Sequence, residues 1–371
     1  MVTNAEINVQ SYNPWRPFTV DKESGLQIVD FANAALTYEK KHELNIGLDL
    51  GFLNNRINLA FDWYKRNNFD LIGPKRTDGV AGQITWYPNV AKMRSHGEEF
   101  TLSTKNIISK DFQWSTDFIF SHTKSKVVEL DARNRIIDLI TGSGFTSAGY
   151  PYRSLFSLDF RGLNENGLPT FVNESGEVTT SDIDFQSYNT EYLIYEGPTD
   201  PTITGSLGNV FSWKGLHLNV FITYAYGNKV RLDPSFAVSY SDLMAMPKEF
   251  QNRWVVPGDE AKTDIPCIPD LRQIQNDSRL GYAFNAYNRS HARTAKGDFI
   301  RMKEISLSYD VPVSFVHHFG LTNMSVKLQA TNPFLIYADK KLNGQDPEFF
   351  NSGGVAVPMA RQFTLTLRLG I

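Results

Sequence analysis

Polar and apolar residues alternate strictly along the last ten positions of the chain. One set of alternating positions is apolar throughout, and the other is polar or glycine: Phe363, Leu365, Leu367, Leu369 and Ile371 against Gln362, Thr364, Thr366, Arg368 and Gly370. A period of two is that of a β-strand, whose successive side chains point to opposite faces. The segment therefore predicts a strand with a wholly apolar face. Such a strand is an aggregation hazard as an exposed edge, whereas a membrane barrel needs strands that show one face to lipid.

The same alternation recurs in four pairs of segments, and the link within a pair is mostly a few residues long. The pairs are residues 44–50 with 57–64, 98–104 with 112–122, 204–213 with 216–227, and 299–309 with 322–332. The first link contains Asn54 and Asn55, a residue type that tolerates the left-handed conformation of tight turns. With the C-terminal strand, the pattern predicts nine strands arranged largely as antiparallel hairpins.

The connections between the hairpins are long. They cover about residues 66–97, 123–203, 228–298 and 333–360, and loops of this length are uncommon in compact soluble domains. Outer-membrane barrels combine short periplasmic turns with long extracellular loops. We therefore expect an all-β fold, a transmembrane antiparallel β-barrel, with its C-terminus on the periplasmic side. This topology requires an even number of strands within 123–203, where residues 152–160 could supply one more. A secreted β-sandwich is the alternative fold.

Composition restricts the function classes. The net charge is −3, and no basic run or stacking motif indicates nucleic-acid binding. The only cysteine, Cys267, excludes an internal disulfide and is expected to be an ordinary loop residue. Residues 1–7 lack the basic segment and the run of about 7–15 apolar residues of a secretory signal peptide. A chain that reaches an outer membrane is then expected to be the C-terminal part of a longer protein.

Catalytic and metal-binding patterns are not found. The seven histidines show no His-x-x-x-His spacing and no ligand spacing with the cysteine. The sequence also has no Gly-x-Ser-x-Gly, P-loop or Gly-x-Gly-x-x-Gly motif. We therefore predict that the chain is not an enzyme and that it has no cofactor and no metal site.

Several phrases along the chain carry a resemblance to a known family: NAALTYEK at 33–40, NIGLDLG at 45–51, NRINLAFDWY at 55–64, NVAKMRSHGEEF at 89–100, GPTDP at 197–201, FITYAYGNKV at 221–230 and FIRMKEISLSY at 299–309. In this order they resemble phrases of the SusC/RagA family of TonB-linked outer-membrane transporters of Bacteroidetes. Ala91 and His96 stand where the family pattern has Gly and Asn. The resemblance extends over nearly the whole chain and implies the C-terminal part of the family's barrel for residues 1–371.

The resemblance also implies a function and partners. The implied function is TonB-dependent uptake of an oligosaccharide or a peptide across the cell outer membrane. The implied partners are a SusD-like surface lipoprotein, the TonB–ExbB–ExbD complex acting through an N-terminal part, and outer-membrane lipid. The family's signal peptide, TonB box and plug domain are not visible, and about nine to twelve of its roughly 22 strands are present.

Aromatic residues in the long connections are the candidate ligand-binding residues. Rings stack on sugar faces and line many ligand pockets, and the candidates are Trp86, Tyr87, Trp254, Tyr282 and Tyr287. Trp63, Tyr64, Tyr224 and Tyr226 are expected near strand ends, as part of an aromatic girdle.

Two alternative functions remain open from the sequence. One is a secreted, soluble glycan-binding β-domain, and the other is a truncated gene product without function. Half a barrel has two unpaired edges and cannot close. We therefore expect that this chain does not transport alone.

Overall fold

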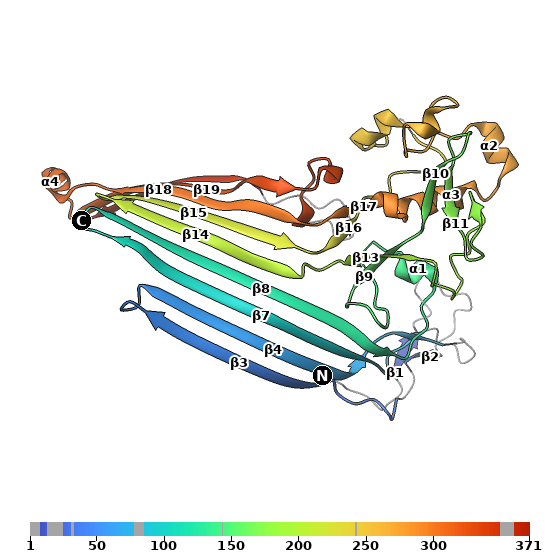
Figure 1. The fold of residues 1–371 in the computed structure, drawn as a ribbon, viewed down its shortest axis with the longest axis horizontal. Coiled ribbons are helices and arrows are strands. Elements are labelled where there is room, and N and C mark those ends of the chain that lie inside the picture. The colour runs from blue at the N-terminus through green and yellow to red at the C-terminus, as the bar shows by residue number, and fades with distance from the viewer. Residues whose placement is uncertain are drawn as a thin grey trace.

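The computed structural model describes residues 8–12, 25–30, 33–77, 85–142, 144–241, 243–348 and 360–371. Nine long strands form one antiparallel sheet in which each strand lies beside its neighbour along the chain (Figure 1). They are β3 (Lys40–Phe52), β4 (Ile57–Ile72), β7 (Asn89–Ile108), β8 (Phe112–Leu130), β14 (Ile203–Trp213), β15 (Leu216–Tyr226), β18 (Phe299–Asp310), β19 (Asn323–Ala338) and β20 (Gln362–Gly370). This confirms the nine predicted strands, although most extend further toward the long connections.

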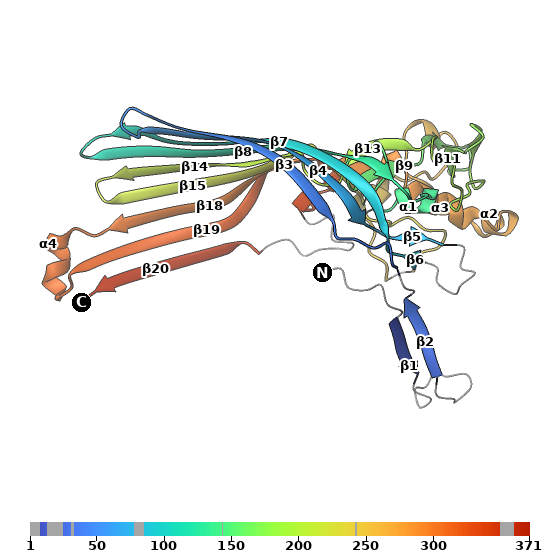
Figure 2. The ribbon, with the colours of Figure 1, turned by 90° about the horizontal axis from the view of Figure 1, so that it is seen from below.

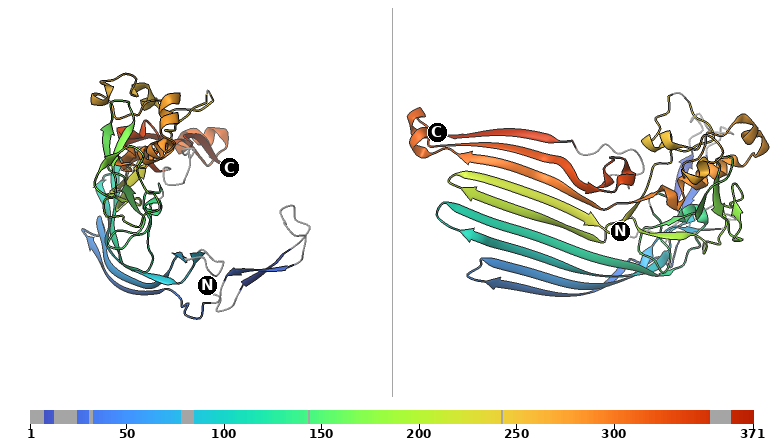
Figure 3. Two further views of the ribbon diagram at one scale, coloured as in Figure 1. Left: turned by 90° about the vertical axis from the view of Figure 1, so that its right-hand side faces the viewer. Right: turned by 45° about the horizontal axis from the view of Figure 1, so that its top comes forward.

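The sheet is an open, curved meander. Figure 3 shows its arc, with β3 and β20 as the two edges among the described strands. Because β14 pairs directly with β8, the intervening segment adds no strand to this sheet, which satisfies the predicted even count. In Figure 2 the small hairpin of β1 (Asn8–Tyr12) and β2 (Gly25–Asp30) projects away from the sheet.

Short turns gather at one end of the sheet and long connections at the other (Figure 1). Leu53, Asn54 and Asn55 all have positive φ, as the predicted first turn requires. Lys214 and Gly215 also have positive φ, in the turn of the third predicted hairpin. The fourth turn carries α4 (Val313–Val316) and a 3-10 turn, His317–Phe319. The C-terminus lies at this short-turn end.

The sheet has one apolar and one polar face, as the alternation predicts. Apolar side chains stand side by side across neighbouring strands, for example Leu48, Phe61, Phe100 and Phe120, or Leu218, Leu307, Leu328 and Leu365. Many of them are exposed, up to 75% for Phe363 and 73% for Leu365. We call this set of outward apolar side chains the apolar belt. The opposite face carries hydrogen-bonded polar pairs such as Ser103 with Asp117 at 2.6 Å.

The long connections fold into a cap with the main buried core. Its core comes mostly from residues 136–193 and 236–287, which meet around Phe171 and Phe284. Its strands are β5 (Lys75–Arg76), β6 (Thr85–Trp86), β9 (Ser154–Ser157), β10 (Phe160–Leu163), β11 (Pro169–Val172), β12 (Val178–Thr179), β13 (Ile194–Pro198), β16 (Lys229–Arg231) and β17 (Thr294–Lys296). Its helices are α1 (Ile136–Leu139), α2 (Leu271–Asn276) and α3 (Leu280–Asn288), with 3-10 turns at Lys248–Asn252, Asp259–Ala261, His291–Arg293 and Lys340–Leu342.

Two expectations are wrong in detail. Residues 152–160 do contain a strand, β9, but it pairs with β13 in the cap and not with the large sheet. Tyr64 is not a girdle residue, because it lies on the polar face and is only 5% exposed. Its hydroxyl is 2.6 Å from the Thr123 hydroxyl, across Gly97 of the strand between them. Among the described residues, no helix has the length and apolar character needed to cross a bilayer.

Candidate functional site

A cavity of about 790 Å³ lies where β4, β7 and β8 enter the cap. The strand ends contribute apolar lining residues, including Leu71, Val90 and Val127. The connection between β4 and β7 forms another part of the wall, and residues 132–153 of the next connection complete it. The cavity is thus assembled from two long connections held on a rigid sheet, an arrangement typical of binding sites.

Two exposed tyrosines and several cations give this cavity its chemistry. Tyr87 is 56% exposed and Tyr152 is 51% exposed, and both line the cavity. The cationic lining residues are Arg76, Arg133 and Arg153, and the polar ones include Glu39 and Asn134. Aromatic faces suit apolar or sugar surfaces, and guanidinium groups suit carboxylates and other oxygen acceptors.

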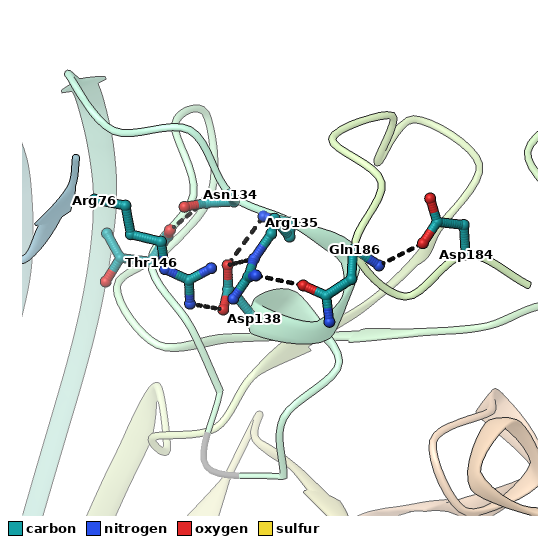
Figure 4. A network of polar contacts seen from close by, with 7 residues as sticks. All are labelled: Arg76, Asn134, Arg135, Asp138, Thr146, Asp184 and Gln186. Carbon is teal, nitrogen blue, oxygen red and sulfur yellow. Dashed lines mark hydrogen bonds and ion pairs between the residues drawn. The ribbon is translucent and has the colours of Figure 1, made fainter. Parts of the chain in front are cut away.

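Asp138 joins the two connections that form the cavity (Figure 4). Its Oδ1 accepts a charge-assisted hydrogen bond from Arg76 of β5 at 2.6 Å. Its Oδ2 accepts from the backbone N–H of Arg135 at 3.0 Å, and the Arg135 guanidinium reaches Gln186. The Asp138 side chain is only 11% exposed and that of Arg76 is 39% exposed, so the ion pair is partly shielded from water.

Helix α1 places Asp138 because its apolar residues are anchored in the cap core. Ile136 and Leu139 are 0% and 2% exposed. The backbone N–H groups of Ile136 and Ile137 donate to the carbonyls of Ser187 and Phe185 at 3.0 and 2.9 Å. The single turn of α1 is therefore held by its buried side chains and by its backbone hydrogen bonds. This position directs the Asp138 carboxylate toward β5.

A tight turn brings Arg153 to the cavity wall. Gly144 has a φ of +74°, and a Cβ there would lie 2.8 Å from the Arg153 carbonyl oxygen. Phe145 and Ser154 then exchange backbone hydrogen bonds of 2.9 Å. A side chain at position 144 would push this loop open.

The five aromatic residues singled out in the sequence do not form one site. Tyr87 lines the cavity, and Trp86 precedes it as a half-buried residue of β6. Trp254 packs on Gly167, and its indole N–H donates to Glu260 at 2.9 Å. Tyr282 is 49% exposed on α3, with its ring centroid 5.9 Å from that of Phe185. Tyr287 is 2% exposed within the cap core, where burial raises its pKa, so its ring faces are covered by protein.

Sequence reasoning missed the other polar lining residues and Tyr152. The only available signal was the dense YPYR stretch at 150–153 inside a long connection. The arginines gave no signal because their grouping depends on how separate connections fold against one another. In the part of the chain that the structure describes, no three His, Cys, Asp or Glu side chains are grouped as metal ligands.

A buried arginine holds the cap together behind the cavity. Arg231 of β16 donates to the carbonyl oxygens of Phe156 at 2.6 Å and Ser290 at 2.7 Å. Burial lowers its pKa from the usual range, and nearby Glu196 opposes that shift. Arg231 therefore joins the connection between β8 and β14 to the connection between β15 and β18. Its role in the described structure is to stabilise the cap.

The fold defines a class of protein: an antiparallel sheet with an apolar belt, short turns at one end and long connections at the other is a segment of a transmembrane β-barrel. The chain is similar in structure to the RagAB peptide importer in its closed-closed state, with a TM-score of 0.75 and 23% identity. That match covers 99% of this chain and 38% of the other, and it confirms the predicted fold.

Relatives of known name agree with this class. The TonB-dependent receptor P3 of Formosa agariphila is 26% identical over 350 residues, which cover 88% of this chain. The TonB-dependent receptor SusC of Bacteroides thetaiotaomicron is 24% identical over 355 residues, covering 91%. No protein-family model matches the sequence. The predicted resemblance to the SusC/RagA family is confirmed, and the chain spans about a third of the length of these curated relatives (32% in both).

Proposed function

We propose that residues 1–371 form the C-terminal part of the barrel of an outer-membrane TonB-dependent transporter that imports a nutrient. The observation that carries this proposal is a sheet with an exposed apolar belt on one face, whose long connections form a cavity lined by apolar, aromatic and charged residues at one end. A soluble glycan-binding domain would not leave such a belt uncovered. The relatives are receptors and importers by name, which supports transport and not catalysis.

The proposal places the remaining strands of the barrel against the open edges of the sheet. Strands β3 and β20 have no partner on their outer sides among the described residues, and their unpaired N–H and C=O groups require partners within a bilayer. In the proposed transporter, a plug domain is coupled to TonB–ExbB–ExbD. A SusD-like lipoprotein lies over the long connections. The chain alone is then unable to transport.

We further propose that the ligand enters the cavity lined by Tyr87 and Tyr152 and is an oligosaccharide or a peptide. Tyrosine faces suit the apolar faces of either. Arg133, which has no ion pair among the described residues, suits acidic groups, which peptides carry at their C-terminus and in side chains. Arg76 and Arg153 already pair with Asp138 and Asp200. Trp86, Trp254 and Tyr282 remain candidates for a ligand that extends over the cap, whereas Tyr287 does not present a free ring.

Uptake measurements test this assignment. Tyr87→Ala and Tyr152→Ala are expected each to raise the half-saturating ligand concentration about two- to tenfold, because one stacked ring contributes roughly 0.5–1.5 kcal/mol. The readout is uptake of labelled oligosaccharide and labelled peptide pools by cells that carry the intact transporter. Tyr38→Ala is the control, since Tyr38 is 69% exposed and does not line the cavity. Unchanged uptake in both cavity variants would refute the proposed site.

A further inference from the structure

A band of basic side chains lies on the outward face of β4, β7 and β8, between the apolar belt and the cap. The strand register places Lys65, His96 and Lys124 side by side, and it places Arg94 beside Lys126 one row closer to the cap. All five are exposed, while Tyr64, Ser95, Gly97 and Val127 between them are buried on the opposite face. We call these five residues the basic band.

The band is continuous with the apolar belt along the same strands. Moving from the short turns toward the cap, the outward residues of β7 are Leu102, Phe100, Glu98, His96 and Arg94, and those of β8 are Phe118, Phe120, His122, Lys124 and Lys126. Along this direction the outward side chains are first apolar, then the Glu98–His122 pair at 2.8 Å, and then the basic residues of the band. This is the order of a lipid's acyl chains and its headgroup.

The lysines and the arginine of the band lie close together and have no ion pairs within the described residues. Lys65, Arg94, Lys124 and Lys126 have no ion pair there, whereas Lys92 on the cap side is neutralised by Glu129 at 2.7 Å. Neighbouring strands are about 4.8 Å apart and same-face residues about 6.8 Å apart, so the cations repel one another at short range. A bound anion would relieve that repulsion.

We propose that the basic band binds the phosphate groups of lipid headgroups in the leaflet nearest the cap. The inference rests on the proposed function, which places the apolar belt in a membrane. Lysine ammonium groups approach a phosphate as point charges, and Arg94 supplies a planar fork for two of its oxygens. A site made from three adjacent strands favours a headgroup with more than one phosphate, because single cations near a membrane each contribute little.

Native mass spectrometry of the intact detergent-purified protein tests the proposal with defined lipids. The probes are bisphosphorylated lipid A, the same glycolipid without phosphate, and phosphatidylcholine. The expected result is preferential retention of the bisphosphorylated form, weakened about tenfold or more in the variant Lys124→Gln/Lys126→Gln. The matched control, Lys110→Gln/Lys214→Gln, removes the same charge from the turns at the other end of the sheet and is expected to bind as the parent does.

The outcomes separate this inference from the function on which it rests. Heat-dependent migration on gels first establishes that each variant forms the same folded barrel. Equal retention of all three lipids, or equal loss in both double variants, would overturn the basic band as a phosphate site and leave the transporter proposal intact. A protein that stays soluble without detergent would instead refute the proposed function itself.

Discussion

Gly97 permits a close contact between β4 and β8 across β7. A Cβ at this position would lie 2.5 Å from the Tyr64 hydroxyl and 2.6 Å from the His122 carbonyl oxygen. Gly97→Ala is therefore expected to lower the free energy of unfolding by about 1–3 kcal/mol. Gly47→Ala is the control, since its Cβ meets only the mobile end of Asp62 at 2.8 Å. Urea unfolding in lipid vesicles measures both, and equal effects would contradict the contact.

Cys267 is a further residue whose surroundings set its chemistry. It is 3% exposed, and burial raises its pKa to about 11. At pH 8 about one folded thiol in a thousand is then ionised, and only the thiolate reacts. Alkylation of the folded protein should be slow and should become rapid in denaturant.

The same shift makes stability depend on pH. The pKa of an unburied cysteine thiol is 9.0, so between about pH 9 and 11 the unfolded chain loses this proton first, and the folded state is destabilised there. Below pH 9 the thiol contributes nothing to the pH dependence. Rapid alkylation under native conditions would show that Cys267 is accessible.

At the scale of the element, Asp138 is the less exposed of two carboxylates that link the connection after β4 to the connection after β8. Asp138→Asn keeps the side-chain volume but removes the charge that holds Arg76 at 2.6 Å. We expect a protease to cut the chain several-fold faster next to Arg76 of β5. Asp131→Asn is the matched control, because Asp131 binds Lys75 at 2.6 Å but is 77% exposed. Equal cleavage rates would mean that the two connections are held by other contacts.

The elements differ in how far sequence predicts them. The long strands were predictable because alternation and short turns are local signals, and even the left-handed turn at Asn54 and Asn55 followed from residue type. The cap was not predictable, since its core joins segments that lie far apart in the sequence, such as those of Phe160 and Tyr287. Tyr64 illustrates the same limit: its place on the polar face followed from alternation, but its burial depends on Gly97 and Thr123 of other strands.

The molecule as a whole joins a sheet that is apolar on one face to a cap that holds the main buried core. Soluble domains bury apolar sheet faces against another layer, whereas here side chains such as Leu365 and Leu367 remain exposed. The cap contains Phe171, Phe284 and their neighbours and covers only the loop end. This separation of an exposed apolar sheet face from a buried cap core fits a protein whose sheet contacts lipid and whose cap contacts water.

A charge placed on either face of β20 tests this division. Leu365 points outward and is 73% exposed, while Thr364 points to the polar face opposite Gln329. Leu365→Arg is expected to destabilise the membrane-inserted protein by about 2–4 kcal/mol, because an outward cation meets hydrocarbon. Thr364→Arg should cost less than about 1 kcal/mol, because it meets polar groups and water. Urea titrations of the intact protein in vesicles measure the difference. If the two substitutions were equally tolerated, the apolar belt would not face lipid, and a partner protein or a second sheet would have to cover it.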